Sequence, residues 1–344
     1  SSSKKEGDKD SGEQHVDPVV LDFIVLKKNS EFTKPNNALN MEFEQIQLKN
    51  GLQVFLINDN FTPYSSFYVE TPHGYAIDTF NGLAHLSEHL SFAGNSTLEK
   101  AYKMWDIVYS LNNAVLYAFT HANKIHYFFS VPEEINFEES LTTMHNFFMN
   151  PYYNIDIIKQ EIQSINSEST QKNNYFEIIG NQIITDLSNE KTSFHGYGMG
   201  NNQTMDISQV EKIKKILVGN AQRAYDPKKL IYVIYSKKSI KQMEEMSVKI
   251  LGKGQRKFDK SEYDVNDVNQ REKNNKDINS EDIDIYGDKL YLHGIILSPT
   301  NIDNTINIYI NIKKFNFTLY NFDPSDYLNY LMMSDSLFDI LRNR

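Results

Sequence analysis

The alternation of apolar and polar positions along the chain predicts strands in its first and middle parts. Runs rich in Val, Ile, Leu, Phe and Tyr with a two-residue period are typical of half-buried strands. Such runs lie at 43–57, 65–72, 114–120, 124–131 and 230–236. The first run is interrupted by Asn50 and Gly51, a dipeptide that strongly favours a tight turn between antiparallel strands. We therefore expect a β-hairpin there.

Apolar residues at intervals of three and four predict helices between these strands. The helices are expected near 81–93, 104–111, 131–151, 154–170 and 239–252, with a kinked continuation of the fourth at 174–187. Asp78 or Thr79 is expected to cap the first helix, and Gly94 to end it. The mixture predicts an α+β fold, with an antiparallel-rich sheet and helices packed on one side.

Changes in composition suggest where domains begin and end. Charged, low-complexity sequence fills the amino terminus and a long stretch beyond Gly252. We expect a polar leader at 1–40 that is largely disordered at its start, a first domain at 41–252, a charged linker or insertion at 253–284, and an incomplete second domain of the same type at 285–344.

Charge and composition narrow the classes of function. The formal net charge is −10 and the Lys-rich pieces alternate with apolar residues, so a nucleic-acid partner is not expected. No apolar run reaches the length of about 18 residues that a membrane span needs. The chain has no cysteine, so any metal must be held by His, Asp or Glu. This composition is compatible with a reducing compartment such as the cytoplasm, without requiring one.

The stretch "NGLAHLSEHLSFAGN" places unusual polar residues in a helix that is otherwise small and apolar. His85 and His89 are four residues apart, so they share one helix face and can bind one ion. Glu88 flanks that face, where its carboxylate can reach water beside the ion. This is the inverted zinc-peptidase pattern His-x-x-Glu-His. The alternative is a pair of core histidines with a capped carboxylate.

A catalytic zinc site needs a third protein ligand and an open position for water. The helix "NIDIIKQEIQSINSEST" offers Glu161 and Glu168, which are seven residues apart and project from one face. One could bind the metal and the other support the site. The alternative for each is a solvated carboxylate on a helix surface. Isolated histidines elsewhere are expected to have a structural or surface role: His73, His121, His126, His145 and His195.

These landmarks resemble the insulinase, or pitrilysin-type, family of inverted-motif zinc peptidases, most closely its insulin-degrading-enzyme branch. The similarity rests on "GLAHLSEHLSFAG", on "EIQSINSE" about 80 residues later, and on the Gly-rich loop "FHGYGMGN". It implies that His85, His89 and Glu168 hold one Zn²⁺ and that Glu161 is the supporting acid. It further implies that Glu88 and the zinc activate water, with Glu88 as general base and then acid.

The resemblance also implies the substrate, the partners and an alternative role. The substrates would be peptides or small unfolded proteins that pair with the edge strand at Tyr117, Ala118 and Phe119. Tyr117 stands where the family usually has Asn. Residues 41–252 would be the catalytic domain, and a missing carboxy-terminal half or a partner subunit would close the chamber. This chain would then be a fragment with reduced or no activity alone. Alternatives are a non-catalytic subunit for assembly or substrate holding, and a structural metal site closed by a fourth ligand.

Overall fold

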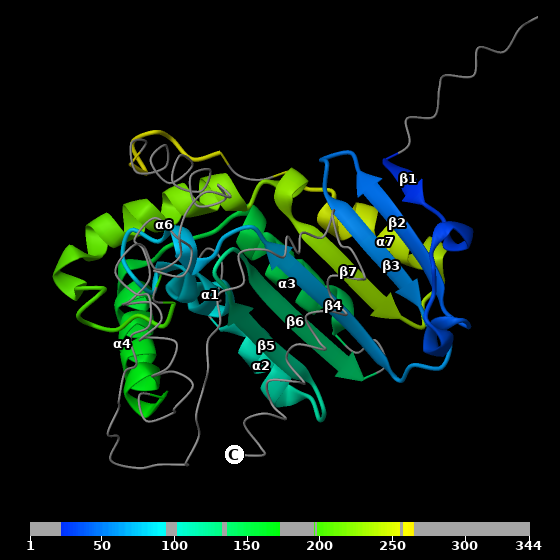
Figure 1. Cartoon of the computed structure of the whole chain (residues 1–344), viewed down its shortest axis with the longest axis horizontal. Coiled ribbons are helices and arrows are strands. Elements are labelled where there is room, and N and C mark those ends of the chain that lie inside the picture. Colours follow the sequence, from blue (N-terminus) through cyan, green and yellow to red (C-terminus); the bar gives the residue numbers. More distant parts are fainter. Residues whose placement is uncertain are drawn as a thin grey trace, which may run out of the picture. The chain divides into compact units, whose positions relative to one another are not determined.

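A seven-stranded sheet forms the centre of the part of the chain that the structure describes (Figure 1). This computed structural model describes residues 22–93, 102–132, 136–172, 196, 198–254 and 257–264. The strands are β1 (Phe23–Lys27), β2 (Glu42–Leu48), β3 (Gln53–Asn58), β4 (Tyr64–Thr71), β5 (Val115–Thr120), β6 (Ile125–Pro132) and β7 (Ile231–Ser236). Their order in the sheet is β1-β2-β3-β7-β4-β6-β5.

The sheet is antiparallel except at one pair of neighbours. β2 and β3 form the predicted hairpin, and Gly51 takes the left-handed conformation with φ +90° that its turn requires. β3 and β7 are parallel, with Val54 opposite Tyr232. β7 also pairs with β4, so it joins the β1–β3 half to the β4–β6 half of the sheet. These pairings confirm the expected antiparallel-rich sheet.

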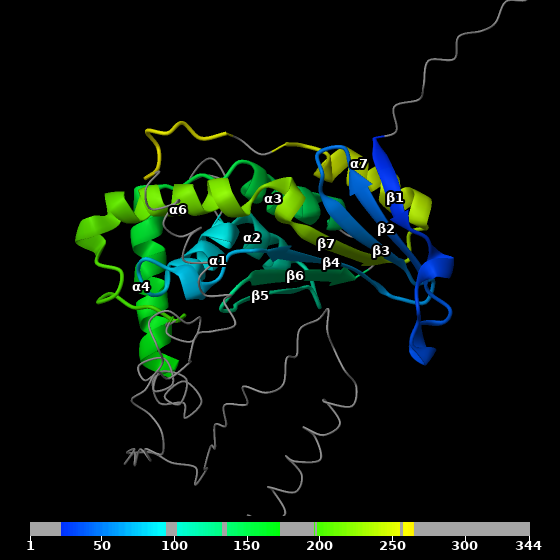
Figure 2. The ribbon, with the colours of Figure 1, turned by 45° about the horizontal axis from the view of Figure 1, so that its top comes forward.

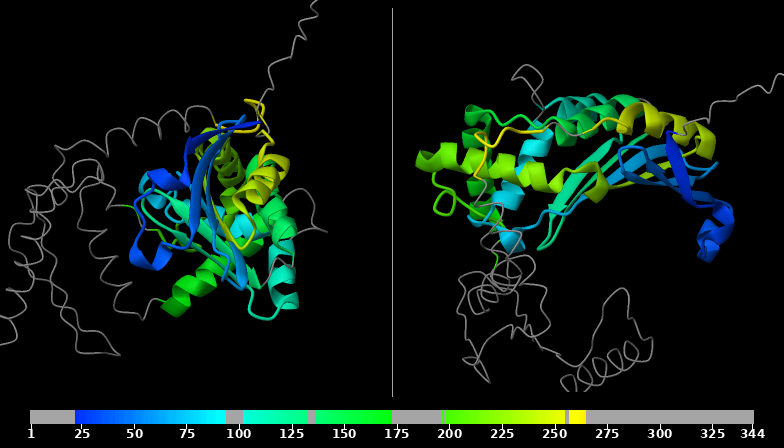
Figure 3. Two further views of the ribbon diagram at one scale, coloured as in Figure 1. Left: turned by 90° about the vertical axis from the view of Figure 1, so that its right-hand side faces the viewer. Right: turned by 90° about the horizontal axis from the view of Figure 1, so that it is seen from above.

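Helices cover one face of this sheet, as Figure 2 shows for α3, α6 and α7, and the views in Figure 3 agree. The α-helices are α1 (Leu83–Ala93), α2 (Lys103–Ser110), α3 (Phe137–Met149), α4 (Ile155–Lys172), α6 (Val210–Ala224) and α7 (Ile240–Leu251); the short 3₁₀ turns are η1 (Asn29–Glu31), η2 (Asn36–Ala38), η3 (Tyr75–Ile77), η6 (Ile207–Gln209) and η7 (Pro227–Lys229). None of the helices in the described ranges has the length and apolarity that crossing a membrane requires.

Burial alternates along the central strands because successive side chains point to opposite faces. Leu56, Phe67 and Ile234 are fully buried under the helices. Phe55 and Tyr68, on the other face, are only partly buried. The main hydrophobic core therefore lies between the sheet and the helices, and it holds α1 against the sheet beside β5.

Several element boundaries differ from the sequence prediction. β1 pairs with β2, so the ordered sheet reaches into the segment expected as a leader. Pro132 closes β6 instead of opening the next helix, and α3 begins five residues later. Gly94, the continuation at 174–187 and the predicted second domain at 285–344 lie outside the described residues, as does most of the predicted linker.

Candidate metal centre

The amino-terminal end of α1 is fixed by local contacts before the two histidines begin. Asp78 Oδ2 accepts a hydrogen bond of 2.9 Å from the Ala84 backbone N–H, which satisfies one of the free donors at the helix start. Asp78 was one of the two expected caps. Gly82 has φ +98° and turns the chain into the helix. His85 is buried and His89 is half-buried, one turn apart on the same face.

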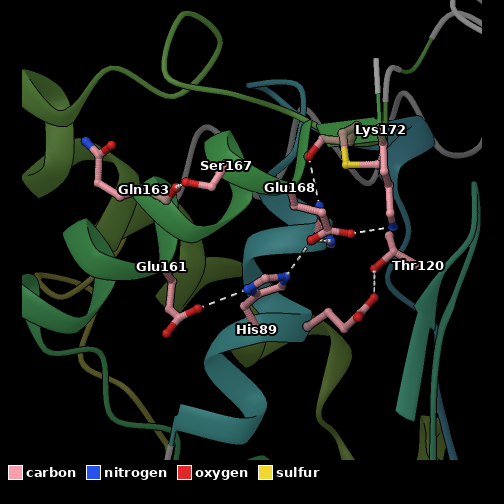
Figure 4. Close-up of polar contacts among 10 residues, drawn as sticks. His89, Thr120, Glu161, Gln163, Ser167, Glu168 and Lys172 are labelled. Atoms are coloured by element: carbon pink, nitrogen blue, oxygen red, sulfur yellow. Dashed lines mark hydrogen bonds and ion pairs between the residues drawn. The ribbon is translucent and has the colours of Figure 1, made fainter. Parts of the chain in front are cut away.

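His85, His89 and Glu168 converge from α1 and α4, although Glu168 lies about 80 residues along the chain. The Nε2 atoms of His85 and His89 lie 3.6 Å and 3.5 Å from Glu168 Oε2. One ligand atom from each residue falls within 4.8 Å of the other two. Figure 4 shows His89 and Glu168 facing each other across this space.

The opposite nitrogen of each ring is bound to an acceptor. His85 Nδ1 lies 2.8 Å from the Met199 carbonyl oxygen, and His89 Nδ1 lies 2.9 Å from Glu161 Oε2. Each Nδ1 therefore carries the proton, and in a neutral ring the Nε2 lone pair faces Glu168. When both rings are neutral, the two Nε2 lone pairs and the carboxylate oxygen can bind one cation together.

The spacing and the donor types fit zinc. Two atoms each about 2.0–2.1 Å from one ion, at a tetrahedral angle, lie about 3.4 Å apart. The two Nε2–Oε2 distances of 3.6 Å and 3.5 Å are close to this value. Two imidazoles and one carboxylate match the three-ligand sets of catalytic zinc sites, in which water takes the fourth position.

The histidines and carboxylates of the cluster shift one another's pKa values. Burial opposes charge on His89, but hydrogen bonds to Glu161 and Glu168 raise its pKa to about 9. Burial and the nearby His89 lower the pKa of His85. The hydrogen bond to His89 and, next, that to Lys172 lower the pKa of Glu168 to about 2, against the effect of burial. These hydrogen bonds thus keep Glu168 as a carboxylate, the form that binds metal.

Two further residues hold the carboxylates, and neither was predicted. Lys172 Nζ lies 2.5 Å from Glu168 Oε1, one helical turn further along α4 (Figure 4). The i, i+4 spacing of Glu and Lys was the signal that could have indicated this pair. The Tyr102 hydroxyl donates to Glu161 Oε1. Burial opposes charge on Glu161, yet bonds from His89 and Tyr102 lower its pKa.

Glu88 lies beside the cluster and contacts the edge strand. Its Oε2 accepts a hydrogen bond of 2.5 Å from the hydroxyl of Thr120, at the end of β5. Glu88 is not one of the three converging ligands in the described residues. Thr120 was not predicted, although its place two residues after Ala118 puts it on the strand face toward α1.

The Gly-rich loop supports α1. Gly200, with φ +71°, lies so close to Gly82 that an added Cβ would be 2.7 Å from the Gly82 Cα. No side chain fits between the two backbones. This close approach brings the Met199 carbonyl to His85. The loop therefore orients the His85 ring.

The edge-strand residues expected to meet substrate are divided between the two sheet faces. Tyr117 and Phe119 are about half exposed, at 49% and 58%, and point away from α1. Tyr117 stacks on Phe128, and Phe119 on His126. Ala118 lies on the same face as Thr120. The structure thus places the strand, but not these two aromatic rings, beside the metal cluster.

The other histidines make contacts outside the cluster. His121 Nε2 lies 3.1 Å from His126 Nδ1, and His145 Nδ1 lies 3.0 Å from the Tyr232 hydroxyl. His73 Nδ1 contacts Arg223. His195 lies outside the described residues.

A protein-family model matches the region that carries these residues. Residues 53–194 match the family described as insulinase (peptidase family M16). The match includes α1, β5 and α4, and hence all three converging ligands and Glu88.

Curated relatives are similar over the same part of the chain. An "Insulin-degrading enzyme homolog" of Dictyostelium discoideum is 29% identical over 62% of this chain and 22% of that protein. The "Insulin-degrading enzyme" of Homo sapiens is 24% identical over 63% of this chain and 22% of its own length. The "A-factor-processing enzyme" of Saccharomyces cerevisiae is 30% identical over 52% of this chain and 17% of that protein. The matched part is thus about a fifth of the length of these relatives.

Solved structures give the same fold. A crystal structure of pitrilysin superposes with a TM-score of 0.60 at 19% identity, covering 67% of this chain and 25% of that one. A protease from Helicobacter pylori gives a TM-score of 0.51 at 23% identity, covering 63% of this chain and 51% of that one. At these identities the similarity establishes the fold alone.

Proposed function

We propose that the chain is a member of the insulinase family (peptidase family M16), whose model matches residues 53–194, and that it carries the zinc site of an endopeptidase or oligopeptidase. The observation that carries this proposal is the convergence of His85 Nε2, His89 Nε2 and Glu168 Oε2, with each Nδ1 bound to an acceptor. A structural zinc would be closed by a fourth protein ligand. Three ligands from the described residues would leave one position open for water or substrate.

The residues of the chain would divide the chemistry between them. Bound zinc would polarise the scissile carbonyl and lower the pKa of the attacking water toward about 7. Glu88 would take the proton from that water and pass it to the leaving amine, as general base and then general acid. Glu161, held by Tyr102, would keep the His89 ring in place. It is therefore a positioning residue.

The edge of the sheet offers a place for the substrate. β5 is the last strand in the order, so its outer edge pairs with no other strand of the described residues. An extended peptide could add there by backbone hydrogen bonds at Tyr117, Ala118 and Phe119. The relatives' names refer to insulin degradation and A-factor processing. By analogy, we propose peptides or small unfolded proteins as the substrate class.

Efficient cleavage would require more of the protein than this chain. The matched relatives are several times longer, since the aligned part is 22% of the human enzyme. We propose that a carboxy-terminal half, or a partner subunit, encloses the substrate. The chain alone would then bind zinc and cleave weakly or not at all.

The test compares Glu88→Gln with the wild type in the full-length protein. Loss of the proton acceptor is expected to lower kcat by about 10²- to 10⁴-fold and to leave the zinc content unchanged. Glu245→Gln, on the exposed side of α7, is a matched control expected to keep full activity. Cleavage that survives Glu88→Gln would exclude this mechanism. A wild-type protein that binds zinc but cleaves no peptide would favour a non-catalytic subunit.

A further inference from the structure

Thr120 makes the closest polar contact to the proposed general base. Its Oγ1 lies 2.5 Å from Glu88 Oε2, and both side chains are half-buried. An ionised carboxylate only accepts hydrogen bonds, so the hydroxyl of Thr120 donates. Bonds of about 2.5–2.7 Å from a hydroxyl to a charged oxygen are stronger than neutral ones. The contact can therefore fix one orientation of the carboxylate.

The position of Thr120 follows from the register of β5. Phe119 pairs with His126 and Thr120 with Ile125, so the two neighbouring side chains point to opposite faces of the sheet. Leu116, on the same face as Thr120, is buried under the helices, whereas Phe119 is exposed. The hydroxyl is thus directed at α1 by the strand itself, and a slip of one residue would remove it.

The contact also distinguishes the two oxygens of Glu88. Oε2 accepts from Thr120, and within the described residues Oε1 has no hydrogen-bond partner. Oε1 is therefore the freer of the two oxygens to take a proton from water, while Oε2 stays bound to the strand. The hydroxyl is drawn in Figure 4 with its bond to the carboxylate.

We propose that Thr120 is a positioning residue for Glu88, an inference that rests on the function proposed above. It holds the carboxylate in one orientation, with Oε2 bound to the strand and Oε1 left to accept the proton of the attacking water. It also couples the base to β5, the strand on whose outer edge a peptide would lie. Alignment of the peptide and orientation of the base would then depend on one short strand.

A purely structural role for Thr120 makes a different prediction. In that case the side chain would only fill space between β5 and α1, and its methyl group would matter as much as its hydroxyl. Thr120→Val keeps the shape and removes the hydroxyl. Thr120→Ser keeps the hydroxyl and removes the methyl group. The pair of variants separates the two roles.

The experiment measures kcat, KM, zinc affinity and the thermal midpoint in the full-length protein. Thr120→Val is expected to lower kcat by about 10- to 100-fold, because a small misplacement of a catalytic group has effects of this size. KM, zinc affinity and the midpoint should stay at wild-type values, and Thr120→Ser should keep kcat within about threefold. Thr142→Val is the matched control, because the Thr142 hydroxyl bonds to the Glu138 carbonyl within α3.

A double variant tests whether Thr120 acts through Glu88. In a Glu88→Gln background, Thr120→Val should cause no further loss of kcat, and it should not change the affinity for an uncleaved peptide. A wild-type kcat in Thr120→Val would overturn the proposal. Equal losses in the Val and Ser variants, or a loss of zinc, would also overturn it. If Glu88→Gln itself retains activity, the proposed function fails, and this result is distinct from failure of the Thr120 contact.

Discussion

Glu161 Oε2 lies 2.9 Å from His89 Nδ1, on the ring nitrogen that faces away from Glu168. The carboxylate is itself buried, at 6% exposure, and is held by the Tyr102 hydroxyl. A negative charge behind a ligand imidazole makes the metal-facing nitrogen a better donor and fixes the ring. The contact thus links α4 to the proposed metal site at a second point besides Glu168.

Glu161→Gln is expected to weaken zinc binding by about 10- to 100-fold, the usual cost of removing such a partner. The amide keeps an acceptor of the same size but loses the charge. Competition with a chelator of known zinc affinity gives the measurement. An unchanged zinc affinity would contradict the role of Glu161. Glu245→Gln serves again as the exposed control.

Gly200→Ala tests the close approach of the Gly-rich loop to α1. Gly200 has φ +71°, and its added Cβ would meet the Gly82 backbone at 2.7 Å. We expect a loss of about 1–3 kcal/mol in stability, because a strained backbone and a steric clash are introduced together. Displacement of the Met199 carbonyl should also weaken zinc binding through His85.

Gly254→Ala is the matched control, since an added Cβ there has no neighbour within 4 Å. Chemical unfolding and zinc titration of both variants give the comparison. If Gly200→Ala behaves like Gly254→Ala in both measurements, the loop does not position His85.

Most of the sheet could be predicted from sequence, but its order could not. Asn50 and Gly51 are a local signal for a tight turn, so the antiparallel pairing of the two strands on either side of them was predicted. The apolar sequence of β7 also predicted a buried strand. Its parallel pairing with β3, however, joins residues about 180 positions apart in the sequence. No short-range pattern specifies such a neighbour. β1 was missed because it is short and follows a charged segment.

The convergence of His85, His89 and Glu168 was predicted from sequence more completely than the contacts that hold these side chains. Helical spacing placed His85 beside His89, and the family resemblance selected Glu168. The contacts at Met199 and Thr120 come from elements whose side chains and carbonyls meet α1 only after folding. The spacing of residues along the sequence does not predict contacts between elements that are far apart in the chain. The alternation of β5 could have suggested which face Thr120 occupies.

His145 predicts how stability depends on pH. It is buried at 1% exposure, contacts the Tyr232 hydroxyl, and its pKa is lowered by burial and, next, by Lys253 from 6.5 to about 3. Above pH 6.5 neither the folded nor the unfolded chain binds a proton here. As the pH falls toward 3, the unfolded chain binds one that the folded chain does not, so stability is lost.

The expected contribution is about 1.4 kcal/mol of unfolding free energy per pH unit below the unfolded pKa. Urea unfolding of the wild type and of His145→Gln between pH 7 and pH 5 gives the measurement. The variant should lose less stability on acidification than the wild type, whatever its stability at pH 7. Parallel pH profiles of the two proteins would show that His145 does not titrate on unfolding.

The zinc content of the chain tests the central claim most directly. After incubation with zinc at neutral pH and dialysis, we predict about one zinc ion per wild-type chain, since one three-ligand site is expected to hold one ion. Glu168→Gln should bind zinc at least about 100-fold more weakly, because a charged ligand is lost. Absence of zinc from the wild type, or full retention of zinc in Glu168→Gln and in His89→Ala, would contradict the site.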